Sequence, residues 1–319
     1  MSITAKMIAD LRAQTGAGIM DCKKALAETN GDIPLAVEYL QKKSLAAVGK
    51  RADKVAAEGA VGSYIHNGRV GALVEINCET DFVGRGEDFQ KLLKSVANHI
   101  AVKAPSHLDQ GDSPEATGET SLLQQRFFED GEKTVADVVT EVAAVIKENI
   151  KVRRFVCFDA GAPNGAVGTY IHDGRIGVLV EVGCETEGAA SGAEVQQLIK
   201  DIAMHVAAMN PSYLDPSEIS DEATAKQREI MAARNEGKPA AMMEKIVDGQ
   251  IRKWHSDVCL MQQEFFKEDK KSVADIISAV AKGVGEKLTV RRFARFELGA
   301  GIEREATDFA AEVAATAGV

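Results

Sequence analysis

The stretch "GAVGSYIHNGRVGALVEINCET", Gly59–Thr80, occurs a second time as "GAVGTYIHDGRIGVLVEVGCET" at Gly165–Thr186. The two stretches align without a gap, and 16 of 22 positions are identical at an offset of 106 residues, from His66 to His172. A match of this length is an internal duplication. The fold of the chain therefore depends on what this stretch forms, because the chain forms it twice.

Each copy of the stretch predicts a β-hairpin. Two runs rich in β-branched and aromatic residues are joined by Asn67-Gly68 in the first copy and by Asp173-Gly174 in the second, and both dipeptides favour two-residue hairpin turns. Further along, Lys151–Phe158 and Thr289–Phe296 have the composition of strands. We expect each of them to complete a three-stranded antiparallel sheet with its hairpin.

Helical periodicity follows each hairpin. Apolar residues recur at helical spacing and form one stripe per copy: Phe89, Leu92, Leu93, Val96 and Ile100, and then Val195, Leu198, Ile199, Ile202 and Val206. A later helix is predicted to begin at Thr134, and its twin at Ser272, because each residue suits an N-cap and has an acidic residue three positions on. Each copy is thus a small module of sheet and helices, and the fold class is α+β.

Three further segments lie outside the duplication. Residues 1–54 predict three short helices with a small core, for which Leu11, Ile19, Leu26, Ile33, Val37 and Leu40 are available. The second copy carries an insertion of 32 residues, and residues from about 217 to 258 predict an antiparallel helical hairpin around Gly237-Lys238-Pro239. Ala306–Val319 predicts a terminal helix. The expected domains are residues 1–54, 55–162, 163–298 with the insertion, and 299–319.

Composition limits the class of protein. No apolar run is long enough to span a membrane, and charges occupy the place of a signal-peptide core, so we expect a soluble, cytoplasmic protein. The five cysteines form no C-x-x-C and favour neither disulfides nor zinc. A net charge of −10 argues against nucleic acid as the main partner and leaves only a local basic patch open. Arg153-Arg154 and Arg291-Arg292, which alternate faces of a strand, are expected to pair with acids of the same chain.

Residue types that enzymes need recur between the copies, but not with the spacing that catalysis demands. Cys78 and Cys184 are expected at buried strand ends, and no base or acidic orienter accompanies them at a diagnostic spacing. His99 and His205 are interpreted as core or flanking residues of helices. No phosphate-binding loop motif is present. We therefore expect a protein that is not an enzyme and has no catalytic residue, cofactor or metal.

One aromatic residue separates the copies. The first has "CETDFVGRG" from Cys78 to Gly86, and the second has "CETEGAASG" from Cys184 to Gly192, so that Gly188 stands where the first copy has Phe82. We expect a flexible loop, in which Phe82 either folds back onto its own core or contacts a partner. Because the twin has no large apolar residue there, the partner contact is favoured.

Four separated segments then resemble one family. "LRAQTGAGIMDCKKALAETNGDIPLAVEYL", "CETDFV", "YIHDGRIGVLVEV" and "GIEREATDFAAEV" together are similar to bacterial translation elongation factor Ts, in the family's order and over nearly the whole chain. The resemblance implies a guanine-nucleotide exchange factor that binds GDP-bound elongation factor Tu, with no direct nucleic-acid or membrane partner. The alternative is a binding or chaperone-like partner of a GTPase without exchange activity.

The resemblance also implies positions of contact. The first three helices would look like a ubiquitin-associated (UBA) domain that docks on the GTPase domain, the insertion like the family's coiled coil, and residues beyond 298 like its C-terminal module. The residues at matching contact positions are Arg12, Ile19 and Met20, the Mg²⁺-dislodging loop Thr80, Asp81, Phe82 and Val83, and His172 near the second hairpin. The second copy departs from the pattern by keeping "CET" without Asp-Phe, which leaves any contact of Glu187 open.

Overall fold

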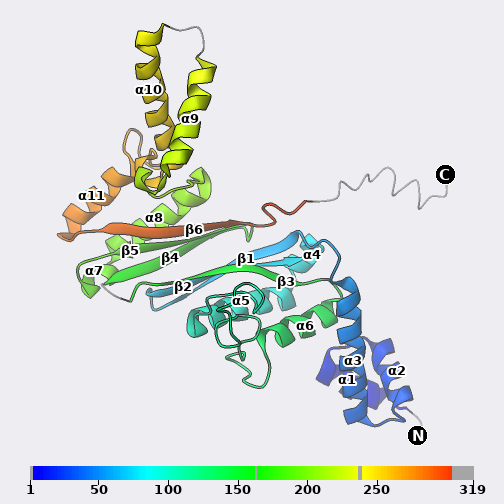
Figure 1. The fold of residues 1–319 in the computed structure, drawn as a ribbon. Coiled ribbons are helices and arrows are strands. Elements are labelled where there is room, and N and C mark those ends of the chain that lie inside the picture. Colours follow the sequence, from blue (N-terminus) through cyan, green and yellow to red (C-terminus); the bar gives the residue numbers. More distant parts are fainter. Residues whose placement is uncertain (1–2, 162–163, 236–238, 304–319) are drawn as a thin grey trace.

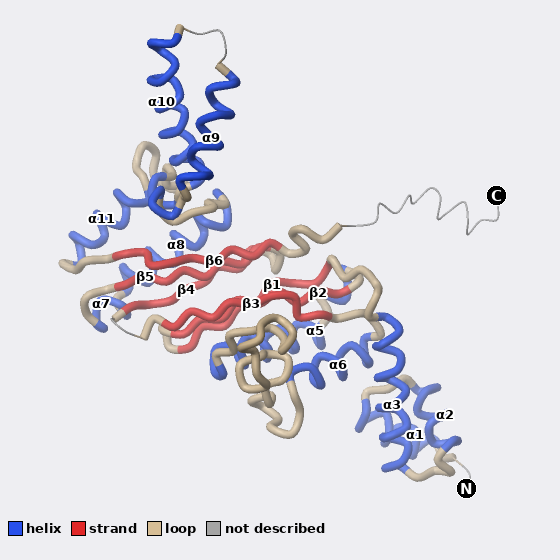
Figure 2. Tube along the Cα trace, in the orientation of Figure 1, coloured by secondary structure: helices blue, strands red, loops and turns tan. Residues whose placement is uncertain are grey.

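The architecture is a mixed α+β arrangement around two sheets. The computed structural model describes residues 3–161, 164–235 and 239–303. Two three-stranded sheets lie side by side at the centre, and the helices of each module cover the outer side of its own sheet (Figures 1 and 2). Three N-terminal helices extend from one end, and a pair of long helices projects from the second module (Figure 1). The expected fold class is confirmed.

The N-terminal segment forms the three predicted helices, α1 (Ala5–Thr15), α2 (Ile19–Glu28) and α3 (Ile33–Arg51). Gly16, with φ of 66°, ends α1 in the left-handed conformation that glycine adopts easily. Leu11, Leu26 and Leu40 are buried in a core shared by the three helices. Ile19 does not join them: it is 54% exposed at the first position of α2, so its assignment to the core was wrong.

The two modules repeat one topology. In the first, β1 (Glu58–His66), β2 (Val70–Cys78) and β3 (Lys151–Asp159) form an antiparallel sheet in the order β1-β2-β3, covered by α5 (Glu87–Lys103) and α6 (Val135–Ile146). In the second, the sheet β4-β5-β6 consists of β4 (Gly165–His172), β5 (Ile176–Gly183) and β6 (Thr289–Glu297), covered by α8 (Ala193–Met209) and α11 (Val273–Val284). The predicted hairpins, helical stripes and third strands are confirmed.

Local chemistry explains these elements. Both residues of each hairpin turn have positive φ, 51° and 69° for Asn67 and Gly68, which matches the type I′ turn that fits the twist of two strands. Thr134 and Ser272 cap their helices through complete capping boxes, as predicted. Nearly all of β2 is buried because one face packs on α5 and α6 and the other faces the second sheet.

The two sheets pack closely and reciprocally. Between them lies a cluster to which both modules contribute equivalent residues, with Val61 and Leu73 from one and Val167 and Leu179 from the other. The N–H of Val61 donates to the carbonyl of Gly174 in the second hairpin turn, and the N–H of Val167 donates to that of Gly68 in the first, both at 2.7 Å. Each hairpin turn is thus fastened to the first strand of the other module.

A buried carboxylate organises each sheet. β3 has a bulge opposite Glu75, which pairs with Arg154 while the next residue pairs with Val152. Both arginines therefore reach the fully buried Glu75, with Arg153 Nη1 at 2.9 Å and Arg154 Nε at 2.6 Å. The second module repeats the arrangement around Glu181. The predicted intramolecular pairing is confirmed, but the expected alternation of the arginines between faces is wrong, because the bulge brings both to one carboxylate.

The insertion and the terminus complete the chain. α9 (Asp221–Arg234) and α10 (Ala240–Val258) form the predicted helical hairpin around Met231, Val247 and Ile251, and short 3₁₀ turns, η1 (Pro216–Glu218) and η2 (Leu260–Gln262), flank it. Among the described helices, none has both the length and the apolar composition that crossing a bilayer would need. The predicted terminal helix at Ala306–Val319 lies outside the described residues.

Candidate functional site

The segment that distinguishes the two copies is a fixed helical turn. Residues Asp81–Gly84 form the short helix α4, so the prediction of a loop here was wrong. Thr80 is its N-cap, and the Thr80 hydroxyl accepts the N–H of Val83 at 3.4 Å. At the other end, a Cβ on Gly84 would lie 2.7 Å from the carbonyl oxygen of Gly59, so only glycine fits there without a shift. The turn is therefore held against the start of β1.

Phe82 points out from this turn. Its side chain is 84% exposed, whereas the neighbouring Val83 packs on the core of the first module. Folding back onto the core is thus excluded for Phe82, and Val83 takes that role. In the second module the equivalent turn is α7 (Glu187–Ser191), where a Cβ on Gly188 would meet no atom of the described residues within 4 Å. The scaffold leaves this outer position free in both copies, and only the first fills it with an aromatic ring.

Two carboxylates anchor the residues before α4. Glu148 accepts the N–H groups of Glu79 at 3.1 Å and Thr80 at 3.0 Å, and it accepts the Thr80 hydroxyl at 2.7 Å. Glu79 accepts the N–H of Asn149 at 2.7 Å and pairs with Arg51 and Lys54, at 3.2 Å and 3.0 Å. Burial alone would raise the pKa of Glu79, but the Asn149 N–H and the two cations hold it below its ordinary value.

Sequence reasoning missed this anchor. Glu148 lies 68 residues from Thr80 in the chain and belongs to no motif. The only available signal was the duplication itself, since Glu286 occupies the same place in the second copy, where it accepts the Thr186 hydroxyl at 2.6 Å.

The second hairpin turn lies at the same end of the core as α4. The Asp173-Gly174 turn is fastened to β1 through Val61, and Arg175 lies 3.9 Å from Glu58, next to the Gly59 on which Gly84 packs. His172 precedes this turn and is exposed, and its Nδ1 lies 3.0 Å from the Tyr170 hydroxyl. The reciprocal docking of the sheets therefore brings His172 of the second module to the end that carries Phe82.

The remaining predicted contact residues form a separate surface. Arg12 is exposed near the end of α1, and Ile19 and Met20 are 54% and 74% exposed at the start of α2. α1 and α2 lie at the far end of α3 from α4, so the structure does not bring these three residues together with Phe82 (Figure 1). The C-terminal end of α3 joins the two surfaces, because Arg51 pairs with Glu79.

The repeated cysteines and histidines have structural environments. Burial and the nearby Glu148 raise the pKa of the Cys78 thiol to about 12, and burial also raises the pKa of Cys184, so neither thiol is activated as a nucleophile. His99 and His205 are buried and bonded to Gln125 and Gln263, which confirms their place in the core. Within the described residues, no group of three or more His, Cys, Asp or Glu side chains could hold a metal ion.

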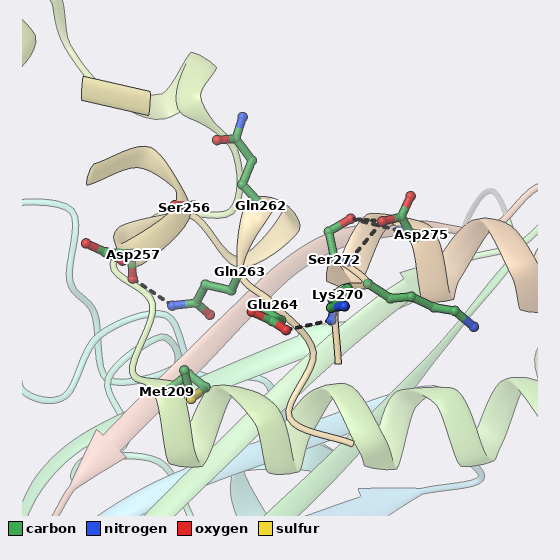
Figure 3. Close-up of a pocket in the computed structure, with 10 residues that line it drawn as sticks. Met209, Ser256, Asp257, Gln262, Gln263, Glu264, Lys270, Ser272 and Asp275 are labelled. Atoms are coloured by element: carbon green, nitrogen blue, oxygen red, sulfur yellow. Dashed lines mark hydrogen bonds between the residues drawn. The ribbon is translucent and has the colours of Figure 1, made fainter. Parts of the chain in front are cut away.

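A pocket of about 570 Å³ lies away from α4, between α8, α10 and α11 (Figure 3). Its lining is mostly polar, and these groups bond to one another: Gln263 donates to the Asp257 carbonyl at 2.8 Å, and Ser272 to Asp275 at 2.7 Å. None of the predicted contact residues lines it. The pocket is therefore not part of the candidate site.

Comparisons with known proteins agree with this architecture. A family model described as elongation factor TS matches residues 79–300. The chain is 45% identical over 323 residues to elongation factor Ts of Trichlorobacter lovleyi, covering all of both proteins. It is 43% identical to that of Bdellovibrio bacteriovorus and 44% identical to that of Symbiobacterium thermophilum, with at least 98% of each protein covered. The chain therefore belongs to the elongation factor Ts family and has a role in translation elongation.

Proposed function

We propose that this protein is a guanine-nucleotide exchange factor that binds GDP-bound elongation factor Tu in the cytoplasm. The observation that carries the proposal is Phe82, an aromatic side chain that is 84% exposed on a turn fixed at both ends. Aromatic residues of this kind anchor interfaces, because a ring with two rotatable bonds loses little entropy when it enters a pocket. The UBA-like helices, with Arg12, Ile19 and Met20, and His172 at the second hairpin would supply further contacts.

The proposed mechanism is displacement rather than bond chemistry. Mg²⁺ beside a bound nucleotide needs near-octahedral oxygen ligands and tolerates little movement of them. A rigid wedge at Thr80–Val83 that shifts the partner's backbone would dislodge the ion and loosen GDP. Asp81 lies 3.5 Å from Arg85, so its negative charge is partly balanced, and Phe82 is the main element of the wedge. Because coupling is reciprocal, GTP entry then weakens the binding of the factor and releases it.

The function needs no catalytic residue, cofactor or metal of the chain itself. The raised pKa of Cys78 supports this view, since a thiol with a pKa of about 12 is protonated at neutral pH. Exchange is then a coupling between two binding equilibria. We infer that the protein is not an enzyme in the sense of making or breaking covalent bonds.

The test is stopped-flow release of a fluorescent GDP analogue from elongation factor Tu. Phe82→Ala should lower the rate enhancement about tenfold to a hundredfold, the range that corresponds to losing an interface anchor. Its free energy of unfolding should change by less than about 0.5 kcal/mol, because the ring is exposed. Gly188→Ala, at the matching position of the second module, is the control and should leave release unchanged. Tight binding without acceleration by the unmodified chain would favour the non-exchanging partner instead.

A further inference from the structure

We propose that Glu148 is a positioning residue for exchange, which fixes the α4 turn so that Phe82 meets the partner in one orientation. The inference rests on the proposed function and adds a residue outside the family-like motifs. Phe82 has almost no packing of its own, so only the backbone on either side can determine where its ring lies. The groups that hold this backbone therefore control the wedge.

Glu148 holds the N-terminal side of the turn. Its three hydrogen bonds reach two consecutive N–H groups and the hydroxyl of the N-cap residue. The Thr80 hydroxyl both donates to Glu148 and accepts the N–H of Val83, so the carboxylate is linked through one atom to the residue after Phe82. Hydrogen bonds to an ionised carboxylate are stronger than neutral ones, and three of them converge on one side chain.

A second carboxylate completes this hydrogen-bond network. Glu79, beside Thr80, accepts the N–H of Asn149, the residue after Glu148. Residues 79–80 and 148–149 thus hold each other through two carboxylates. On the C-terminal side of the turn, the Gln90 side chain donates to the Gly84 carbonyl at 2.5 Å. Both ends of α4 are anchored, and the exposed ring lies between them.

The second module supplies a comparison for this arrangement. Glu286 accepts the Thr186 hydroxyl, but its other carboxylate oxygen is buried and, among the described residues, has no hydrogen-bond partner. The fuller network occurs where the turn carries Phe82, and the reduced one where it carries Gly188. A role in folding alone would be shared by both turns, whereas a role in positioning the ring belongs to Glu148 only.

The experiment compares Glu148→Gln with Glu286→Gln in the full chain. In the first variant the new amide group would place a donor against N–H and O–H donors and loosen the turn. Across a range of factor concentrations, Glu148→Gln should lower the maximal rate of GDP-analogue release from elongation factor Tu about tenfold, with a half-saturating concentration within about twofold of the unmodified value. Glu286→Gln should leave both values unchanged. An equal loss in the two variants overturns the proposal.

A double-mutant cycle separates positioning from a general structural effect. If Glu148 acts through the ring, Glu148→Gln should slow release no further in a Phe82→Ala background. Additive losses would mean that Glu148 does not act through Phe82. Should Glu148→Gln fail to fold, Thr80→Val removes only the hydroxyl bonds and should give a smaller loss in the same direction; an unchanged maximal rate in that variant contradicts the proposal.

Failure of the proposed function can be recognised separately. If the unmodified chain does not accelerate release at all, the exchange function fails, and the positioning role is then measured by amide hydrogen exchange. Faster exchange at residues 79–84 in Glu148→Gln, with no change at residues 185–190 in Glu286→Gln, would show that Glu148 fixes the turn. Unchanged protection of residues 79–84 would overturn this part too.

Discussion

The two short helical turns, α4 and α7, have the same local structure but differ in the side chains that they turn outward. Each begins at a capping threonine that bonds to a glutamate after the last helix of its module. At α7, Glu187 is tied back to the protein by Arg69 of the first hairpin at 2.9 Å. At α4 the equivalent residue, Asp81, pairs with Arg85 of the same turn, and the next residue, Phe82 in place of Gly188, is exposed to solvent. The comparison teaches that the duplication supplies a scaffold twice, while the candidate wedge is a property of a few residues in one copy.

The largest expected effect concerns the buried carboxylates, where the copies are nearly alike. Glu75→Gln should lower the free energy of unfolding by about 3 kcal/mol, because two arginines lose their buried partner. Glu75 also accepts the N–H of Gly299 at 2.8 Å and the side-chain amide of Asn77 at 3.2 Å, where the second module has Gly183. We therefore expect Glu181→Gln to be less damaging by about 2 kcal/mol, the usual contribution of two hydrogen bonds. Urea unfolding of the two variants measures the difference.

Glu297→Gln, at an exposed carboxylate of β6, is the surface control and should change stability by less than about 0.5 kcal/mol. A larger loss in Glu181→Gln than in Glu75→Gln would show that the bonds from Gly299 and Asn77 do not strengthen the first network. The buried carboxylate of the second module would then contribute more to the free energy of unfolding than that of the first.

A smaller effect on stability is expected from pH, because each module buries one histidine. The N–H of Phe128 donates to Nδ1 of His99, so this nitrogen carries no proton in the folded state, and burial lowers the pKa of the ring. His205 is held in the same way, and burial lowers its pKa as well. Because the unfolded chain binds protons more readily here, stability should fall as pH drops below about 6.5, by at most about 1.4 kcal/mol per pH unit for each histidine.

Thermal unfolding between pH 7.5 and 5.5 measures this dependence, in a range above the titration of ordinary carboxylates. His99→Gln and His205→Gln should each remove about half of it. If one variant removed all of the dependence, the two buried histidines would not be equivalent, and the modules would differ in their cores as well as at their turns.

The smallest effect is expected from moving the aromatic residue. Gly188→Phe should change the free energy of unfolding by less than about 0.5 kcal/mol, because a Cβ at this position meets no described atom within 4 Å. In a Phe82→Ala background it should not restore GDP release, because the N-terminal helices lie at the other end of the core from α7 (Figure 1). His172 lies at that end too, since the turn that follows it is bonded to β1. Stopped-flow measurement of GDP release with the double variant tests this expectation. Restored exchange would show that an aromatic residue on either turn supports exchange, and the difference between α4 and α7 would then not explain the activity.

Elements encoded by local patterns could be predicted from the sequence, whereas contacts between distant segments could not. Turn dipeptides, apolar stripes and capping residues identified both sheets and their helices, because these signals act over a few residues. The bulge that joins Arg153 to Glu75, and the bond from Glu148 to Thr80, depend on tertiary structure. Ile19 was assigned wrongly for a related reason: its spacing suits a core, but the helix turns it outward.

At the candidate site, a difference between two copies was more informative than any motif. The contrast of Phe82 with Gly188 identified an exposed aromatic residue without structural information, and its exposure is confirmed. The short helix around it was missed, because four residues are too few to show periodicity. The approach of His172 to the same end follows from the reciprocal packing of the sheets, which the sequence of one hairpin does not encode.

The reciprocal fastening of the sheets has a consequence for how the chain folds. Val61 forms a hydrogen bond with Gly174, and Glu75 accepts the N–H of Gly299, which lies 224 positions later in the chain. Such distant contacts slow folding, because long loops must close before any contact compensates for the lost entropy. During synthesis from the N-terminus, the first module would therefore remain incomplete until β6 has left the ribosome. The two modules should fold as one cooperative unit, and a chain that ends before residue 289 should be prone to aggregate.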